Sequence, residues 1–251
     1  MRVLITRPLP AAAALAARLA ALGHEALLEP VLTIAQEPDA RARLATALDG
    51  AQAVLLTSTN GVASFASATE RRDLRAFAVG DGTAAAARHA GFAEVESAQG
   101  DVETLTKLVA ARLTPSRGAL VHASGHTVAG DLAGRLARLG FAVRSVPLYN
   151  AIAADALGAS TMDALRSGKV DAALFFSPRT AGTFVRLARA AGIERGCARA
   201  ASVALSPAVA AELEGLSWGR VLVAEAPTEA AMLKALDRLD EELRRPGALN
   251  P

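Results

Sequence analysis

The sequence predicts an α/β protein of two Rossmann-like or flavodoxin-like lobes, each built on a parallel sheet, with a connector of two strands between them. One observation behind this prediction is alternation. Short apolar runs bounded by Gly, Pro or Ser alternate with longer segments whose apolar residues recur at three and four positions. This pattern is typical of strands alternating with helices. The other observation is that the 251-residue chain repeats itself, which predicts two domains of ordinary size.

The repeat is clearest between residues 18–32 (RLAALGHEALLEPVL) and 135–149 (RLARLGFAVRSVPLY), which match without a gap at a separation of 117. The match continues between 53–62 and 172–181 at a separation of 119, and between 79–91 and 203–215 at 124. This period indicates a duplicated domain, because solenoid repeats have periods of roughly 20 to 50 residues.

The first half begins with an expected strand at residues 2–6 and a helix at 10–22, whose Leu15, Leu19 and Leu22 share one face. Gly23 ends this helix, as glycine commonly does. Further strands are expected at 26–34, 53–57, 76–79 and 93–97, and helices at 38–48, from 61, at 83–90 and at 102–113. Asp101 is the expected N-cap of the last helix.

The second half follows the same order. Strands are expected at 119–122, 143–152, 172–176, 201–205 and 220–224, and helices at 127–139, 157–167, 179–190, 207–213 and 228–244. We expect residues 246–251 to form a frayed tail.

Two of the expected strands are long and contain a proline, Pro30 or Pro147, which cannot donate to a sheet ladder. Each is the second strand of its copy. We interpret them as connectors near residues 26–36 and 143–152, with an edge strand as the alternative. Lobe 1 would then comprise residues 1–34 and 148–251, lobe 2 would comprise 35–147, and a cleft bordered by Tyr149 would lie between them.

The composition narrows the function classes. Hydrophobic residues make up 52% of the chain and aromatic residues 4%, so the core must consist of Ala, Leu and Val. The net charge of +2 comes with dispersed arginines, which argues against nucleic-acid binding and is compatible with an anionic small molecule. The single Cys197 fits a reducing cytoplasm. No signal peptide and no ~20-residue membrane span are expected, and with no apolar stripe left unassigned we expect a soluble monomer.

Polar turns follow nearly all of the expected strands. In open parallel sheets, ligands bind beyond the carboxyl ends of the strands. Taken alone, each turn is better explained as a helix cap, but capping and anion binding are compatible because helix N-termini serve both. The candidate binding residues are Arg7, Thr57, Ser58, Asn60, Gly61, Gly80, Thr83, Ser124, Ser177, Arg179 and Ser206.

Other constellations are weaker. The turn at Gly80 lacks the third glycine of a dinucleotide-binding loop. His122 and His126 straddle the end of an expected strand with no Cys or acidic cluster nearby, so we expect no metal site. Tyr149 is the only tyrosine. The residues leave open whether it packs with its hydroxyl in water or takes part in chemistry at the cleft.

Five short motifs, in their order and spacing, make the chain similar to the uroporphyrinogen-III synthase family. They are Thr6-Arg7-Pro8, Thr57-Ser58 followed by Asn60-Gly61-Val62, Ala78-Val79-Gly80 with Thr83, Tyr149 on the connector, and Phe176-Ser177-Pro178. The resemblance extends to about Leu239. It implies two Rossmann-like lobes joined by a pair of strands, with the chain ends in one lobe and the middle in the other.

The resemblance also implies a reaction. Linear hydroxymethylbilane loses its terminal hydroxyl as water and closes to uroporphyrinogen III with the last pyrrole ring inverted, through a spiro intermediate, in the biosynthesis of haem, sirohaem or cobalamin. Such a cyclising hydro-lyase needs no cofactor and no metal. Because the bilane closes unaided to the symmetrical isomer, catalysis would consist mainly of orientation. The turns would hold the eight carboxylates, with Arg7 and Arg179 adding charge-assisted bonds.

Under this resemblance Tyr149 is the expected proton donor to the leaving hydroxide, directly or through water, since a phenol is protonated at neutral pH. The bilane-forming enzyme is an expected transient partner. Two departures stand out: Ser124-Gly125 replaces an Arg-Gly frequent in the family, and residues 204–207 replace a glycine-threonine turn. They shift binding to backbone groups or mark a divergent member. A noncatalytic two-lobed binder of an anionic small molecule is therefore the alternative function.

Overall fold

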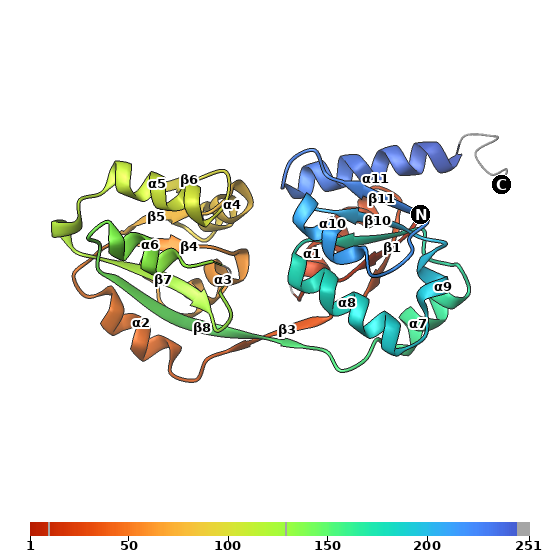
Figure 1. Cartoon of the computed structure of the whole chain (residues 1–251), viewed down its shortest axis with the longest axis horizontal. Coiled ribbons are helices and arrows are strands. Elements are labelled where there is room, and N and C mark those ends of the chain that lie inside the picture. The colour runs from red at the N-terminus through yellow and green to blue at the C-terminus, as the bar shows by residue number, and fades with distance from the viewer. Residues whose placement is uncertain (10, 129, 245–251) are drawn as a thin grey trace. The chain divides into compact units, whose positions relative to one another are not determined.

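The computed structural model describes residues 1–9, 11–128 and 130–244. Within them the chain divides into two compact units (Figure 1). Unit 1 joins residues 1–33 to 152–251, and unit 2 comprises residues 34–151. The expected helix start at Pro10 and the expected tail at 246–251 lie outside the described residues.

Unit 1 is built on a five-stranded sheet in the order β11-β10-β9-β1-β2. Every pair in it is parallel. Read in chain order, the five strands have the flavodoxin-like arrangement 2-1-3-4-5. The elements are β1 (Arg2–Ile5), α1 (Ala11–Ala21), β2 (Glu25–Leu28), α7 (Ala159–Arg166), β9 (Ala172–Phe175), α8 (Pro178–Ala190), α9 (Glu194–Cys197), β10 (Ala201–Ala204), α10 (Pro207–Leu213), β11 (Arg220–Val223) and α11 (Glu229–Arg244).

Unit 2 is built on a six-stranded sheet in the order β3-β8-β7-β4-β5-β6. Its last five strands repeat the arrangement of unit 1, with β7 and β8 in the places of β1 and β2. The elements are β3 (Leu32–Gln36), α2 (Ala40–Leu48), β4 (Ala51–Leu56), α3 (Thr59–Ala68), β5 (Arg75–Ala78), α4 (Asp81–His89), β6 (Val95–Ser97), α5 (Val102–Arg112), η1 (Pro115–Arg117), β7 (Ala119–Gly125), α6 (Leu132–Arg138) and β8 (Val143–Ala153).

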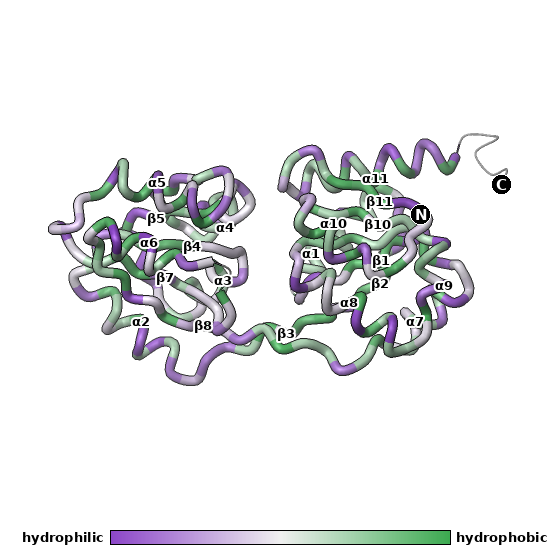
Figure 2. The backbone as a smooth tube through the Cα atoms, viewed as in Figure 1, coloured by the Kyte–Doolittle hydropathy of each residue, from purple (hydrophilic) through white to green (hydrophobic). Residues whose placement is uncertain are grey.

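Each sheet is buried on both faces. In unit 1, Leu4 and Phe175 pack with α7, α8 and α10, while their neighbours Ile5 and Leu174 pack with α1 and α11. Unit 2 has the same two layers, with α2, α3 and α4 on one face and α5 and α6 on the other. Figure 2 shows the hydrophobic runs along the strands and the polar residues on the helices. The predicted α/β fold with parallel sheets is confirmed.

The predicted repeat is visible in the backbone. Gly23 and Gly140 both have φ in the left-handed region, at 81° and 87°, and both follow a helix that precedes the second strand of a copy. A side chain at this angle would be strained, so glycine is the residue that suits this helix end. The sheets add that each copy is divided between the units. The first copy gives β1 and β2 to unit 1 and β3 to β6 to unit 2, and the second copy gives β7 and β8 to unit 2 and β9 to β11 to unit 1.

Of the two proline-bearing segments, the second is the long strand that was expected, β8, and the first differs from the expectation. The strand expected at 26–34 is interrupted around Pro30 into β2, at the edge of one sheet, and β3, at the edge of the other. The N–H of Glu37 donates to the carbonyl of Leu148, and the N–H of Ala154 donates to that of Val31, so β3 runs antiparallel to β8. In this register β3 ends before it reaches Pro147. The missing N–H of Pro147 therefore costs no hydrogen bond to β3.

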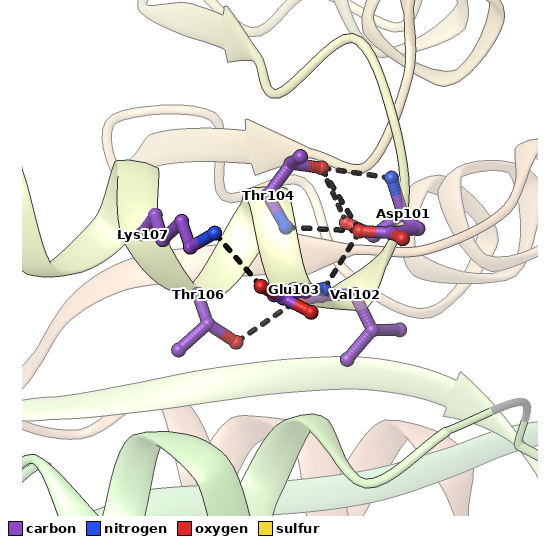
Figure 3. A network of polar contacts seen from close by, with 6 residues as sticks. All are labelled: Asp101, Val102, Glu103, Thr104, Thr106 and Lys107. Carbon is purple, nitrogen blue, oxygen red and sulfur yellow. Dashed lines mark hydrogen bonds and ion pairs between the residues drawn. The ribbon is translucent and has the colours of Figure 1, made fainter.

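Local caps set the helix boundaries. The carboxylate of Asp101 accepts from the N–H groups of Glu103 and Thr104, and the Thr104 hydroxyl accepts from the N–H of Asp101 (Figure 3). These bonds lower the pKa of Asp101 and confirm it as the N-cap of α5. The helix expected at 127–139 begins later than predicted. β7 continues to Gly125, and α6 begins only after Asp131, whose carboxylate caps the helix by accepting from the N–H of Gly134. The expected helix at 127–139 is therefore too long.

Candidate active site

The polar residues at the carboxyl end of β4 in unit 2 include a hydroxyl pair, Ser58 and Tyr149. The Ser58 Oγ lies 2.9 Å from the Tyr149 phenol oxygen. The same Oγ accepts from the N–H of Gly61 at 2.9 Å, which makes Ser58 the N-cap of α3. Residues 58 and 149 are thus joined across 91 positions at the carboxyl end of β4. This end lies beside β7, at the point where the strand order reverses and where such sheets bind ligands.

A β-bulge turns Tyr149 toward Ser58. Ser124 pairs with Pro147, but Gly125 pairs with Tyr149, so β8 has one extra residue there. Tyr149 consequently joins the same buried cluster as Val146 and Leu148, instead of alternating away from Leu148. Its ring lies against the α-carbon of Gly125, where an added Cβ would meet the Tyr149 Cζ at 2.8 Å. Only glycine leaves room for the phenol.

Thr57 contacts a histidine that the sequence did not mark for this turn. Its Oγ1 lies 3.2 Å from the Nε2 of His122. Burial lowers the pKa of His122 to about 4, so the imidazole is neutral at physiological pH. Thr57 and His122 are therefore a second neutral, hydrogen-bonded pair, beside Ser58 and Tyr149.

The other predicted residues of unit 2 differ in their burial and in the element that carries them. Gly61 lies close to β7, since its Cβ would meet the carbonyl of Ala123 at 3.0 Å, and Asn60 is half-buried in the first turn of α3. Gly80 is the N-cap of α4, and Thr83 is buried in that helix. Ser124 is 3% exposed inside β7, because the strand is longer than expected.

In unit 1, Arg7 belongs to an ion-pair cluster with Arg18 and Glu229. Its Nη1 lies 2.7 Å from one carboxylate oxygen of Glu229, and Arg18 pairs with the other oxygen. The guanidinium also lies over the Phe176 ring, 4.4 Å from its centre. Arg7 follows β1 and Phe176 follows β9, which are neighbouring strands. A cation is therefore present at the strand ends of unit 1, already paired with a carboxylate.

The remaining predicted residues of unit 1 start helices. Ser177 is the N-cap of α8, where its Oγ accepts from the N–H of Thr180 at 3.2 Å and lies 2.8 Å from that residue's hydroxyl. Arg179 is exposed in the first turn of α8. Ser206 precedes α10 as its N-cap without a capping side-chain bond, so it offers a hydroxyl beside a helix N-terminus.

His126 and Glu37 form a pair that was not among the residues predicted for the site. In the structure His126 Nε2 lies 2.8 Å from the Oε1 of Glu37, and the N–H of His126 donates to the carbonyl of Tyr149 at 3.0 Å. The position of His126 after an expected strand was the one sequence signal that could have marked it as a site residue. Nothing in the local sequence pairs it with Glu37, which is 89 positions away.

Three other findings bear on the chemistry. In the part of the chain that the structure describes, no group of three or more His, Cys, Asp or Glu side chains is arranged to hold a metal ion. None of the described helices has the length and apolarity of a membrane span. Burial, followed by the charge of Glu194, raises the pKa of Cys197 to about 12, so its thiol stays protonated.

Comparisons with known proteins agree with this architecture. The fold is similar to a crystal structure of a mutant uroporphyrinogen III synthase from Thermus thermophilus, at 21% identity and a TM-score of 0.60, over 96% of this chain and 99% of that one. It is also similar to uroporphyrinogen-III synthetase from Helicobacter pylori, at 16% identity and a TM-score of 0.61, over 95% of this chain and all of the other, 100%. A search of curated protein sequences found no match.

The sequence comparison decides the family. The sequence model described as "Uroporphyrinogen-III synthase HemD" matches residues 13–234, which include every described strand except β1. The resemblance inferred from five short motifs is thereby confirmed over nearly the whole chain. The chain belongs to the uroporphyrinogen-III synthase family of tetrapyrrole biosynthesis.

Proposed function

We propose that the protein is a cyclising hydro-lyase that converts hydroxymethylbilane to uroporphyrinogen III, with Tyr149 as the proton donor to the leaving hydroxide. Family membership supports the reaction. The observation that supports the role of Tyr149 is its 2.9 Å contact with Ser58 at the N-terminus of α3.

The hydrogen bonds of Ser58 suit a proton donor. The Ser58 Oγ already accepts from the N–H of Gly61, so its own proton can be donated to the Tyr149 oxygen. In that arrangement the phenol proton is free for the substrate. When Tyr149 gives it up, the phenolate is stabilised by the Ser58 hydroxyl and by the positive end of the α3 dipole.

Substrate carboxylates would be held by the polar turns that follow the strands. The groups are the helix N-termini at Gly80, Ser177 and Ser206, the hydroxyls of Thr57 and Thr83, the side chains of Asn60 and Ser124, the N–H of Gly61, and the guanidinium groups of Arg7 and Arg179. Helix N-termini bind anions because their N–H groups are unpaired and their dipoles favour negative charge. In this proposal the chain needs no cofactor or metal, since holding the bilane in one conformation is the main task.

The proposal extends to the setting of the reaction. We propose that the protein acts as a monomer in the cytoplasm and takes the bilane by transient hand-over from the enzyme that makes it. The free bilane closes unaided to the symmetrical isomer, so a short transfer favours the type III product. The buried, protonated Cys197 fits a reducing compartment. Gel filtration at micromolar concentration tests the monomer.

The decisive experiment generates hydroxymethylbilane in the presence of the protein and measures the ratio of type III to type I uroporphyrinogen after oxidation. We expect type III from the wild type, and a fall of about 10²- to 10⁴-fold in its rate for Tyr149→Phe, as for loss of a general acid. Thr46→Ala is the control, because it removes an exposed hydroxyl of α2 that bonds only to the Ala42 carbonyl.

Two outcomes would contradict the proposal separately. Type I alone from the wild type, at the unaided rate, would exclude the synthase and leave a noncatalytic binder of an anionic molecule. Type III at an undiminished rate from Tyr149→Phe would keep the synthase and remove Tyr149 from its chemistry.

A further inference from the structure

The pair His126 and Glu37 lies next to Tyr149 and has no role in the mechanism above. His126 directly follows Gly125, the residue on which the Tyr149 ring rests. Its N–H donates to the carbonyl of Tyr149, while the N–H of Glu37 donates to the carbonyl of Leu148 on the opposite edge of β8. The imidazole and the carboxylate therefore meet across the strand that carries the phenol.

Glu37 orients the imidazole for proton transfer. Its Oε1 lies 2.8 Å from Nε2 of His126, so the carboxylate favours the tautomer with its proton on Nε2 and its lone pair on Nδ1. The carboxyl side chain is 18% exposed and the imidazole 50% exposed. The Nη2 of Arg43 lies 3.8 Å from the other oxygen of Glu37, so this carboxylate also has a cationic neighbour. Within the described residues, no hydrogen bond to Nδ1 is formed, which leaves this nitrogen available to a ligand.

The proposed reaction needs a base as well as an acid. One proton is added to the leaving hydroxyl, which departs as water. After the terminal ring has been inverted, its α-carbon carries both the new carbon–carbon bond and its original hydrogen. That hydrogen must leave as a proton, and the electrons of the C–H bond restore the aromatic pyrrole. One proton enters and one leaves, so no oxidant or reductant is involved.

We propose that Nδ1 of His126 accepts this proton from the terminal ring, with Glu37 as the positioning residue that holds the ring and stabilises the imidazolium. The proposal rests on the proposed function. The imidazolium then returns its proton to the Tyr149 phenolate through solvent, which resets both groups. The arrangement has the roles of a carboxylate–histidine dyad, in which the carboxylate sets the tautomer of the base.

The test compares His126→Gln with wild type on hydroxymethylbilane that carries deuterium at the free α-carbon of its terminal ring. Glutamine can still donate to Glu37 but cannot take up a proton. We expect kcat to fall by about 10²-fold or more, as for loss of a general base. We also expect a primary deuterium effect larger than that of wild type, because proton removal becomes rate-limiting. His89→Gln, at an exposed end of α4, is the matched control with unchanged kinetics.

Two further variants separate chemistry from structure. We expect Glu37→Gln to lower kcat while leaving KM near the wild-type value, since it disturbs the base and not the substrate contacts. Added imidazole should restore part of the activity of His126→Ala in proportion to its concentration, and should leave Tyr149→Phe unchanged.

The failures can be told apart. If the wild type makes no type III product, the proposed function itself is wrong. If the wild type makes type III and His126→Gln has the wild-type kcat and deuterium effect, His126 is not the base. If His126→Gln raises only KM, its imidazole binds a substrate carboxylate and the proposal is equally overturned.

Discussion

The carboxyl ends of β1 and β9 in unit 1 and of β7 and β4 in unit 2 are equivalent places in two copies of one fold, yet they carry different chemistry. In unit 2 the residues are neutral hydroxyls with an oriented histidine. In unit 1 they are two arginines around Glu229. Ser58 and Ser177 correspond in the repeat and both cap a helix, but only Ser58 has a tyrosine partner. Duplication preserved the frame, and the residues on it diverged.

This comparison suggests a division of labour within the proposed function. The groups that can give or take a proton lie in unit 2, and the paired cations lie in unit 1. Tyr149 corresponds in the repeat to Leu32, and Arg7 corresponds to Ser124. At these two pairs of positions neither unit holds the polar group of the other. Changes in unit 2 should therefore affect the rate of chemistry, while changes in unit 1 should affect affinity.

The largest effect is expected where the unit 2 site is most tightly packed. Gly125→Ala places a methyl group 2.8 Å from the Tyr149 Cζ, which must move the phenol away from Ser58. We expect type III formation to fall by about 10²-fold, with a loss of roughly 1–3 kcal/mol of stability from overpacking. Gly82→Ala, where a Cβ meets no atom within 4 Å, is the control. Equal product ratios and rates for the two variants would show that the position of the phenol is unimportant.

The stability of the two units should depend differently on pH below about 6.5. The unfolded chain protonates His122 below pH about 6.5 and the folded chain only below about 4. Between these values the unfolded state binds more protons, so stability is lost as the pH falls from about 6.5 to about 4, by roughly 3 kcal/mol. Ile5 occupies the equivalent position of β1, where this titration is missing.

The only tyrosine and the only tryptophan lie in different units, which makes this measurable. Urea unfolding followed by Tyr149 emission reports on unit 2, and Trp218 emission reports on unit 1. We expect the Tyr149 midpoint to fall between pH 6.5 and 4 in wild type and to fall less in His122→Gln. The same pH dependence in both proteins would mean that His122 is not the responsible group.

The smallest effect is expected at the ion-pair cluster of unit 1. Glu229 competes with substrate carboxylates for Arg7. We therefore expect Arg7→Met to raise KM about tenfold, equivalent to about 1.4 kcal/mol, and Glu229→Gln to lower KM, with the isomer ratio unchanged in both. Arg18→Met is the control, since Arg18 is more exposed and pairs with the same carboxylate. A change in KM in the same direction for Arg7→Met and Glu229→Gln would contradict the competition.

The sequence by itself determined the secondary structure and the family. Alternating periodicity, glycine stops and cap residues such as Asp101 and Ser58 act over a few residues, so they can be recognised locally. The repeat and the five motifs required only order and spacing. The interruption at Pro30 was the main error in the strands, because a proline in an apolar run suggests one long connector until both sheets are known.

Only the tertiary structure decided which polar residues are paired within each unit. The bulge that turns Tyr149 depends on the register between β7 and β8, and the Arg7–Glu229 pair joins residues 222 positions apart. The pairing of His126 with Glu37 likewise depends on β8 lying between β7 and β3. These contacts depend on which strands become neighbours, and the packing of whole sheets determines that. Short-range sequence patterns carry no information about such distant partners.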